Sequence, residues 1–140
     1  MRMRLRKASA KLLARERVCR VATAGKDGMP HVTPVCHVLA DGKIYFAAGG
    51  NSQKVRHLTA NPHLAVLVDL YTDDWSWLKG VMVQGTARLL RRGPEFRKIR
   101  TLLYQKYPHY PDESAVEESD DVIVEVTPAR VASWGLEDPR

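Results

Sequence analysis

Hydrophobic and polar positions along the chain mostly alternate with the two-residue period of β-strands. Runs rich in valine, isoleucine and aromatic residues, bounded by glycine, proline or asparagine, predict strands. The predicted strands are 17–24, 31–40, 43–48, 63–71, 81–91 and two short strands within 121–136 that break at Thr127-Pro128. Gly85 predicts a β-bulge inside the strand 81–91. Asp41-Gly42 predicts a tight hairpin between the second and third strands.

Three stretches show helical spacing instead, at 3–17, 52–60 and 93–108. In the first, Leu5, Ala8, Leu12 and Leu13 fall on one face. The remaining segments, 25–30, 72–80 and 109–120, have the composition of loops.

Strands outnumber helices in this pattern, and their order is mostly antiparallel. We therefore expect a mainly β fold, a closed or partly closed β-barrel with flanking helices packed outside it. The 140 residues suit a single domain, 1–140, with a core of useful size. Residues 1–16 would form a basic N-terminal helix or arm, and residues 17–136 the core of the barrel.

The positive charge is concentrated at the start of the chain. Residues 1–20 hold eight Lys or Arg and one acid, which makes +7, whereas the other 120 residues hold 14 bases and 15 acids. A solvated helix face explains such a run, and a surface that attracts an anionic ligand is the alternative. Nucleic-acid binding is a weaker hypothesis, because the arm has no aromatic residue for base stacking. We expect no nucleic-acid partner.

The sequence contains no run of eighteen apolar residues, so we expect no membrane span and no membrane partner. Its first twenty residues lack the apolar core and the cleavage site of a secretory signal. Cys19 and Cys36 form neither a metal-binding spacing nor a disulfide framework. A cytoplasmic protein with reduced thiols and no metal site is the expectation.

One predicted helix has positively charged residues at its start, where negatively charged residues are favourable. The stretch 49–68, "GGNSQKVRHLTANPHLAVLV", places Lys54, Arg56 and His57 in the first turns of the predicted helix and no acid there. A helix N-terminus is already positive, so these bases need either water or a bound anion. Ser52 and the backbone N–H groups would complete a phosphate site. The preceding residues 47–50 have little side-chain bulk and would let a flat ligand approach the backbone.

Two other features are ambiguous. His31 and His37 lie six residues apart on one predicted strand, so they would share a face and contact a ligand or a haem, or simply line the rim. Trp75 and Trp77 stand in the unusual loop "YTDDWSWL". They would cover a cofactor ring, join an interface or pack beneath the loop.

The order of these motifs resembles the pyridoxamine-5′-phosphate-oxidase-like, FMN-binding split-barrel superfamily over roughly residues 12–136. The most specific part of the resemblance is the pattern formed by Ser52, Lys54, Leu58, Asn61 and Pro62. The loop with the two tryptophans looks more like the branch that uses the deazaflavin F420.

The resemblance implies a six-stranded antiparallel split barrel and a homodimer, with F420 or FMN bound in two clefts between the subunits. By the same resemblance, Ser52 and Lys54 would bind the cofactor phosphate, and Val32 to Val35 would lie along the ring system. The implied cofactor-binding residues, with the two loop tryptophans, are Val32, Thr33, Pro34, Val35, Ala47, Ala48, Ser52, Gln53, Lys54, Arg56, Trp75 and Trp77.

The chain departs from the vitamin-B6 oxidases of that superfamily. Gln53 stands where they carry an arginine, although Arg56 could substitute for it, and Lys79-Gly80 replaces a glutamine. Their C-terminal substrate-binding segment has no counterpart in "VASWGLEDPR". We therefore expect an enzyme that transfers a hydride between F420 or FMN and a small organic acceptor, and not a pyridoxamine-phosphate oxidase. No catalytic residue is assigned.

Two further functions fit the same sequence. One is a non-catalytic module that binds or carries FMN or F420, since no catalytic side chain is evident. The other is a haem-binding split-barrel protein that uses His31, His37 or His63.

Overall fold

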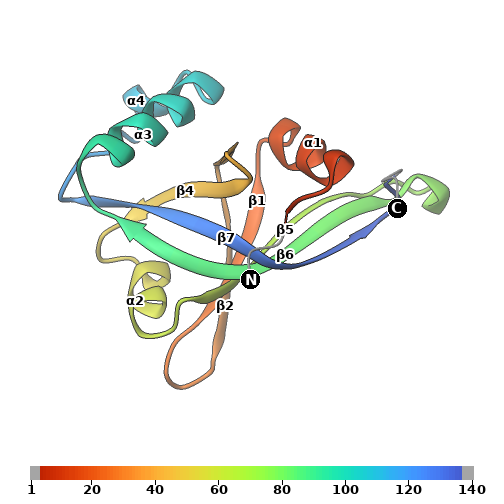
Figure 1. The fold of residues 1–140 in the computed structure, drawn as a ribbon, viewed down its shortest axis with the longest axis horizontal. Helices are drawn as coiled ribbons and strands as arrows, with labels where there is room; N and C mark the ends of the chain where they lie inside the picture. Colours follow the sequence, from red (N-terminus) through yellow and green to blue (C-terminus); the bar gives the residue numbers. More distant parts are fainter. Residues whose placement is uncertain (1–3, 137–140) are drawn as a thin grey trace.

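The computed structural model describes residues 4–136; residues 1–3 of the expected arm and 137–140 of the C-terminal segment lie outside them. The described residues form seven strands and a few helices. In order, the elements are α1 (Lys7–Arg15), β1 (Cys19–Ala24), β2 (Pro30–Val35), β3 (His37–Ala40), β4 (Lys43–Gly49), α2 (Gln53–Ala60), β5 (His63–Leu70), the short 3₁₀ helix η1 (Trp75–Trp77), β6 (Lys79–Leu90), α3 (Pro94–Lys106), α4 (Tyr110–Glu113) and β7 (Asp121–Trp134). Figure 1 shows their arrangement.

All seven strands belong to one antiparallel sheet in the order β2-β1-β5-β6-β7-β4-β3. Its two edges, β2 and β3, are separated in the sequence by Cys36 alone. Because consecutive Cα atoms are about 3.8 Å apart, the two edge strands must come together at this residue. The sheet therefore curls into a half-barrel, and the expectation of a mainly β fold with flanking helices is confirmed.

The expected single strand 31–40 is wrong, because the chain leaves one edge of the sheet and joins the other at Cys36. β2 pairs with β1, and β3 pairs with β4. The sheet has seven strands, where the resemblance implied a six-stranded barrel. The same break corrects the prediction that His31 and His37 share a strand face: His31 is on β2, and His37 is fully buried on β3.

The break expected at Thr127-Pro128 is also absent, because β7 runs unbroken from Asp121 to Trp134. Proline has no N–H to donate to the ladder. β7 tolerates it because the register shifts between Gln84 and Gly85 on β6, and Gly85 is opposite Pro128. A register shift at Gly85 is thereby confirmed, but the extra residue, Ala129, lies on β7 and not inside the strand 81–91, where the bulge was expected.

The hairpin expected at Asp41-Gly42 is confirmed. It joins β3 to β4, with φ values of 52° at Asp41 and 73° at Gly42. Two successive positive φ values are typical of the type I′ turn, which matches the twist of the strands.

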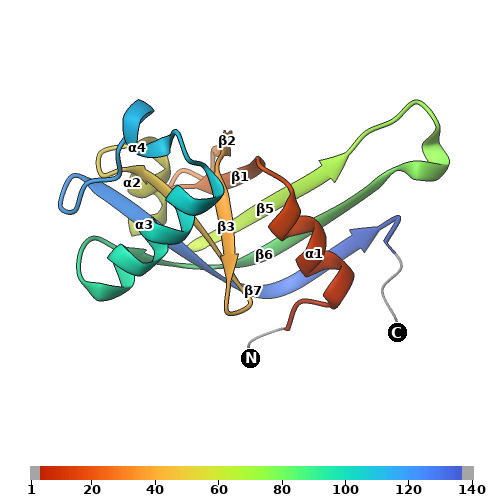
Figure 2. The ribbon, with the colours of Figure 1, turned by 90° about the horizontal axis from the view of Figure 1, so that it is seen from above.

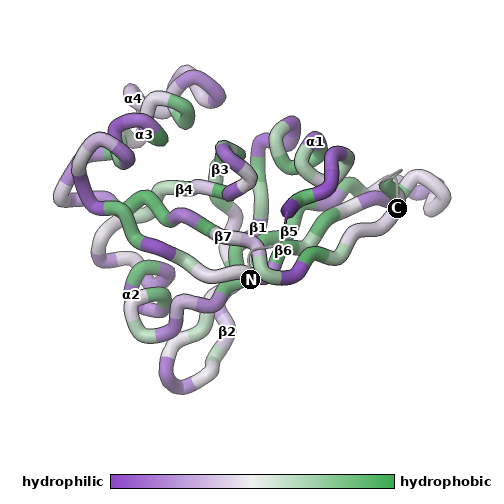
Figure 3. The backbone as a smooth tube through the Cα atoms, in the orientation of Figure 1, coloured by the Kyte–Doolittle hydropathy of each residue, from purple (hydrophilic) through white to green (hydrophobic). Residues whose placement is uncertain are grey.

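The inner face of the curled sheet is filled by one apolar cluster that α1 and α2 cover. Leu12 and Leu13 come from α1, Val55 and Leu58 from α2, and valines such as Val66 from the strands. The basic residues of α1 remain exposed, so this part of the arm is an amphipathic helix. Figure 3 shows the apolar strands at the centre of the molecule and hydrophilic stretches on the helices.

A second apolar cluster lies on the outer face, under α3, and includes Phe96, Leu103 and Ile123. It covers the end of the sheet formed by β3, β4 and the first half of β7 (Figure 2). Arg88 and Glu125 lie beside it, with the guanidinium donating to both carboxylate oxygens at 3.0 and 2.9 Å. The outer face of β2, β1 and β5 is not part of this cluster.

Among residues 4–136, no helix is both long and apolar enough to cross a membrane.

Candidate functional site

The start of α2 is built as an open helix N-terminus. Ser52 caps it, and its Oγ accepts from the N–H of Val55 at 3.4 Å. The N–H of Ser52 donates to the carbonyl of Gly49 at 3.0 Å, which closes the turn from β4 into the helix. The N–H groups of Gln53 and Lys54 have no acceptor inside an α-helix, because the first turn leaves them pointing outward.

Lys54 turns from this helix toward β2. Its Nζ donates to Thr33 Oγ1 at 2.9 Å. Among residues 4–136, no carboxylate forms an ion pair with it, and burial lowers its pKa below the ordinary lysine value. A partly buried cation without an anion favours binding of an anionic group.

Arg56 folds back over the same helix end. Its Nη1 donates to the carbonyl of Asn51 at 3.1 Å, and its Nη2 donates to Gln53 Oε1 at 2.8 Å. Both contacts are to neutral oxygens. Lys54 and Arg56 therefore bring two positive charges, neither paired with an acid in the described part of the chain, to the positive end of one helix.

The four predicted residues of β2 point to two faces of the sheet. Thr33 is opposite the inward-facing Val21 of β1, and Val35 packs on the inner cluster. Val32 lies on the outer face and is 63% exposed. Pro34 lies beside it on the same face. β2 is an edge strand, so its free backbone edge, rather than all four side chains, is available to one ligand.

The alanines that end β4 are also divided between faces. Ala47 packs against the outer cluster and Ala48 against the inner one. Gly50 has a packing role, since a Cβ there would lie 2.7 Å from the carbonyl oxygen of Asp120. Gly49 has open space around it, so the low bulk expected to admit a ligand is present at that residue.

Trp75 and Trp77 lie far from α2 within one chain. They stand in η1, at the tip of the β5–β6 hairpin, and are 72% and 67% exposed. Figures 1 and 2 both place this tip and α2 at opposite ends of the molecule. Asp74 caps the turn, and Trp75 Nε1 donates to the hydroxyl of Tyr71 at 3.3 Å. One chain alone therefore does not bring the tryptophans to the helix.

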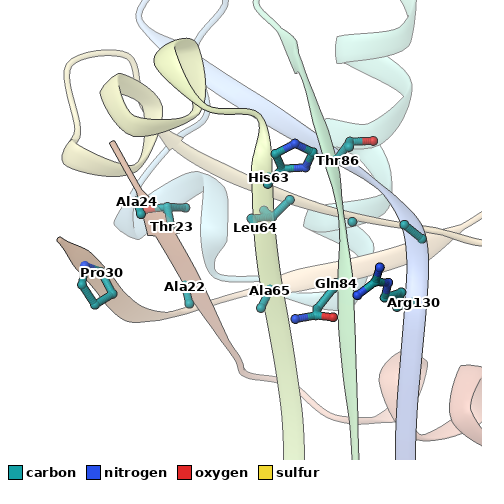
Figure 4. A pocket seen from close by; sticks show the side chains of 12 residues that line it. Ala22, Thr23, Ala24, Pro30, His63, Leu64, Ala65, Gln84, Thr86 and Arg130 are labelled. Atoms are coloured by element: carbon teal, nitrogen blue, oxygen red, sulfur yellow. The ribbon is translucent and has the colours of Figure 1, made fainter. Parts of the chain in front are cut away.

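A pocket of about 530 Å³ opens on the outer face of β1, β5 and β6 (Figure 4). Ala22 and Ala65 belong to its apolar part, and Gln84 and Arg130, cross-strand neighbours, to its polar part. None of the predicted cofactor-binding residues lines it. The sequence signal for this face was the series of small residues at the outward positions of the strands.

A group that the sequence analysis did not assemble lies beside Lys54. His57 Nδ1 is 3.0 Å from Thr23 Oγ1 of β1, and its Nε2 is 2.6 Å from Gln53 Nε2. The ring of His31 meets that of His57 edge to face, with centroids 5.8 Å apart. The pairing of β1 with β2 and the docking of α2 create this cluster, so no local motif could have predicted it.

His37, the other histidine considered for a ligand, belongs to the core. Its Nε2 lies 2.6 Å from the carbonyl of Leu13, and burial lowers its pKa to about 4. Within residues 4–136, no three His, Cys, Asp or Glu side chains are placed to hold a metal ion.

Solved structures similar to this chain bind different groups. A FAD-binding protein from Mesorhizobium loti is 24% identical, with a TM-score of 0.73 over 89% of this chain and 90% of its own. An F420 reductase is 24% identical, with a TM-score of 0.68 over 91% and 98%. The haem storage protein HutZ from Vibrio cholerae is 14% identical, with a TM-score of 0.77 over 97% of both chains. At these identities the likeness concerns the fold alone.

No curated protein matches the chain. The sequence model of the family described as pyridoxamine 5′-phosphate oxidase matches residues 5–135, nearly the whole chain. With the curled antiparallel sheet and its flanking helices, this match shows that the chain belongs to the pyridoxamine 5′-phosphate oxidase family of split-barrel proteins.

Proposed function

We propose that this protein is an oxidoreductase that transfers a hydride between F420 or FMN and a small organic acceptor. One observation carries the proposal: at the N-terminus of α2, the cationic Lys54 is held against β2 by Thr33 and has no carboxylate partner among residues 4–136. A phosphate bound there would supply the missing negative charge.

The residues present fit a phosphate. The open N–H groups of Gln53 and Lys54 can donate to its oxygens, and the helix dipole favours its charge. Lys54 and Arg56 add two cationic donors at the same helix end. The bases that make this helix start unfavourable on its own would then stabilise the bound anion.

The ring of the cofactor would lie along the free edge of β2, next to Thr33 and the exposed Val32. When bound, such a ring supplies the hydride chemistry, and the chain's residues orient it and limit the access of water. The similar FAD-binding protein and F420 reductase support this class of cofactor. We propose that the protons needed alongside the hydride transfer come from solvent water.

The outer face supports a homodimer. Its outward positions on β1, β2 and β5 include Ala22, Val32, Ala65 and Leu67, where a solvated sheet face would carry polar residues. We propose that a second copy covers this face and fills the pocket lined by Ala65. Contiguous apolar surface of this kind is typical of protein interfaces.

The dimer would also account for the tryptophans. Trp75 and Trp77 are too far from α2 in their own chain to touch a cofactor there (Figure 1). The extended β5–β6 hairpin of a second copy could bring them to it, and we propose that they cover the cofactor ring of that copy. The site would then be complete only in the homodimer.

The test is a fluorescence titration of the cofactor-free protein with F420 and, separately, with FMN. The variant is Lys54→Met, which keeps the aliphatic stem and removes the charge. A charge-assisted hydrogen bond contributes about 1.5–3 kcal/mol, so we expect binding to weaken roughly 10- to 150-fold. Lys98→Met is the matched control, because Lys98 is an exposed lysine on α3. Equal affinities for the two variants would contradict the proposed phosphate site.

Further measurements separate the alternative functions. Steady-state oxidation of the reduced cofactor by quinone or nitro acceptors supports the enzyme, and binding without turnover supports a carrier module. A haem absorption band without F420 or FMN binding would overturn the proposal in favour of haem binding. Ala65→Arg on the outer face should give a monomer by light scattering and weaken cofactor binding, although Lys54 is unchanged.

A further inference from the structure

A chain of hydrogen bonds connects β1 to Arg56 across the first turn of α2. Thr23 Oγ1 contacts His57 Nδ1 at 3.0 Å, and His57 Nε2 contacts Gln53 Nε2 at 2.6 Å. The Oε1 atom of Gln53 accepts from Arg56 Nη2 at 2.8 Å. Gln53 is thus placed between a histidine, a side chain that can gain a proton, and an arginine of the proposed phosphate site.

The contacts determine where His57 carries its proton. A guanidinium can only donate, so Gln53 must present its oxygen to Arg56 and its NH₂ group to His57. The NH₂ group is itself a donor, so His57 Nε2 must accept and carry no proton. His57 is therefore neutral, with its proton on Nδ1, where it can donate to Thr23 Oγ1.

We propose that His57, Gln53 and Arg56 form a pH-sensitive relay that adjusts anion binding at the start of α2; it rests on the proposed function. Protonation by solvent adds an N–H at His57 Nε2, which would face the NH₂ group of Gln53. The amide must then turn its oxygen toward His57, which breaks its contact with Arg56 Nη2 and leaves the Nη1 contact with the carbonyl of Asn51. The guanidinium can then turn toward the anion, and His57 adds a positive charge. Anions should therefore bind more tightly where imidazoles are charged.

The groups around His57 favour a coupling between its protonation and the binding of an anion. From β2, His31 faces it edge to face, and its Nδ1 is buried without a hydrogen-bond partner among the described residues. From β1 comes the neutral Thr23, and a Cβ at Gly25 would lie 2.9 Å from the His57 ring. The charged neighbours on its own helix, Lys54 and Arg56, are both cations.

No carboxylate in residues 4–136 forms a hydrogen bond or an ion pair with His57 that would hold the added proton. A bound anion would supply that stabilisation. By linkage, the anion and the proton then strengthen each other's binding by the same factor.

The experiment uses the full-length protein labelled with ¹⁵N and inorganic sulfate as the probe, because sulfate keeps the same charge between pH 5.5 and 7.5. Long-range ¹H–¹⁵N correlations at pH 7.5 should show the proton of His57 on Nδ1. Sulfate titrations followed at the amides of Gln53 and Lys54 should give a dissociation constant roughly threefold to tenfold lower at pH 5.5, the range for one partly exposed charged contact.

Variants separate the relay from simple attraction by a charged histidine. His57→Gln should remove the pH dependence. Gln53→Ala should lose most of the pH dependence, because Gln53 then holds Arg56 at neither pH and only the charge of His57 still changes. His109→Gln, an exposed histidine outside the site, is the matched control and should behave as the unaltered protein. His31→Gln should retain the response.

The outcomes also distinguish this inference from the proposed function. Sulfate binding that Lys54→Met abolishes but that does not change with pH would overturn the relay and leave the anion site intact. A pH dependence in Gln53→Ala as large as in the unaltered protein would overturn the relay in favour of direct attraction by His57. Absence of sulfate shifts in α2 at both pH values would overturn both.

Discussion

The burial of His37 predicts that this protein loses stability as the pH falls below neutrality. The side chain is fully buried, and its Nε2 donates to the carbonyl of Leu13 at 2.6 Å. Its Nδ1 is buried without a partner among the described residues, so an added proton would have no acceptor there. Burial, with a smaller effect from Lys106, lowers the pKa of His37 from 6.5 to about 4.

The sign follows from the two pKa values. Between pH 6.5 and about 4 the unfolded chain binds a proton at His37 that the folded chain does not bind. The contribution of His37 to the free energy of unfolding is therefore complete above pH 6.5. It decreases as the pH falls, until the pH reaches about 4, the pKa of His37 in the folded chain. At 1.36 kcal/mol per pKa unit, the loss is about 2 kcal/mol from pH 7 to pH 5 and about 3 kcal/mol by pH 4.

The assay is urea denaturation, followed by tryptophan fluorescence, of the unaltered protein and His37→Gln at several pH values from 7.5 to 4.5. Glutamine does not titrate, and its amide nitrogen can replace Nε2 as the donor to Leu13. The free energy of unfolding of the unaltered protein should fall toward that of the variant by about 2 kcal/mol between pH 7 and pH 5. A difference between the two proteins that stays constant over this range would refute the reasoning.

Three substitutions test other parts of the structure, each by urea denaturation. Gly85→Ala should lower the free energy of unfolding by about 1–3 kcal/mol, because the added Cβ would overlap the carbonyl of Thr127 at the bulge. An unchanged urea midpoint would mean that the two strands can move apart there without loss of stability. Arg88→Met should cost about 1.5–3 kcal/mol at pH 7, because Arg88 holds the pKa of the buried Glu125 below its ordinary value. This loss of unfolding free energy should become smaller at low pH, where Glu125 is protonated. A loss that does not change with pH would contradict the role given to Arg88. Ser52→Ala should cost about 1 kcal/mol through the lost cap, whereas Ser52→Gly should cost less.

Features set by neighbouring residues could be predicted from the sequence. The Asp41-Gly42 turn, the register shift at Gly85 and the start of α2 at Ser52 each follow from the chemistry of a few adjacent positions. The break at Cys36 could not be predicted in this way. The alternation of "HVTPVCHVLA" continues through it, and the break arises only because the curled sheet brings its two edges together.

The candidate site also has a part that the sequence predicts and a part that it does not predict. Lys54 and Arg56 were recognisable because their positive charge conflicts with the helix start, and Ser52 because serine is a common N-cap residue. The contacts of Thr33 with Lys54 and of Thr23 with His57 depend on how α2 docks on β1 and β2. Such contacts join residues more than twenty positions apart, and hydrophobic periodicity carries no information about them.

The two edges of the sheet also bear on how concentrated solutions of the protein should behave. β2 contains Pro30 and Pro34, which have no N–H to offer an incoming strand, and β3 has only four residues. Exposed edges recruit other chains into fibrils when they are long and regular, and neither edge is. Even a variant that has lost its outer-face partner should therefore remain dispersed or form amorphous clusters rather than ordered fibrils.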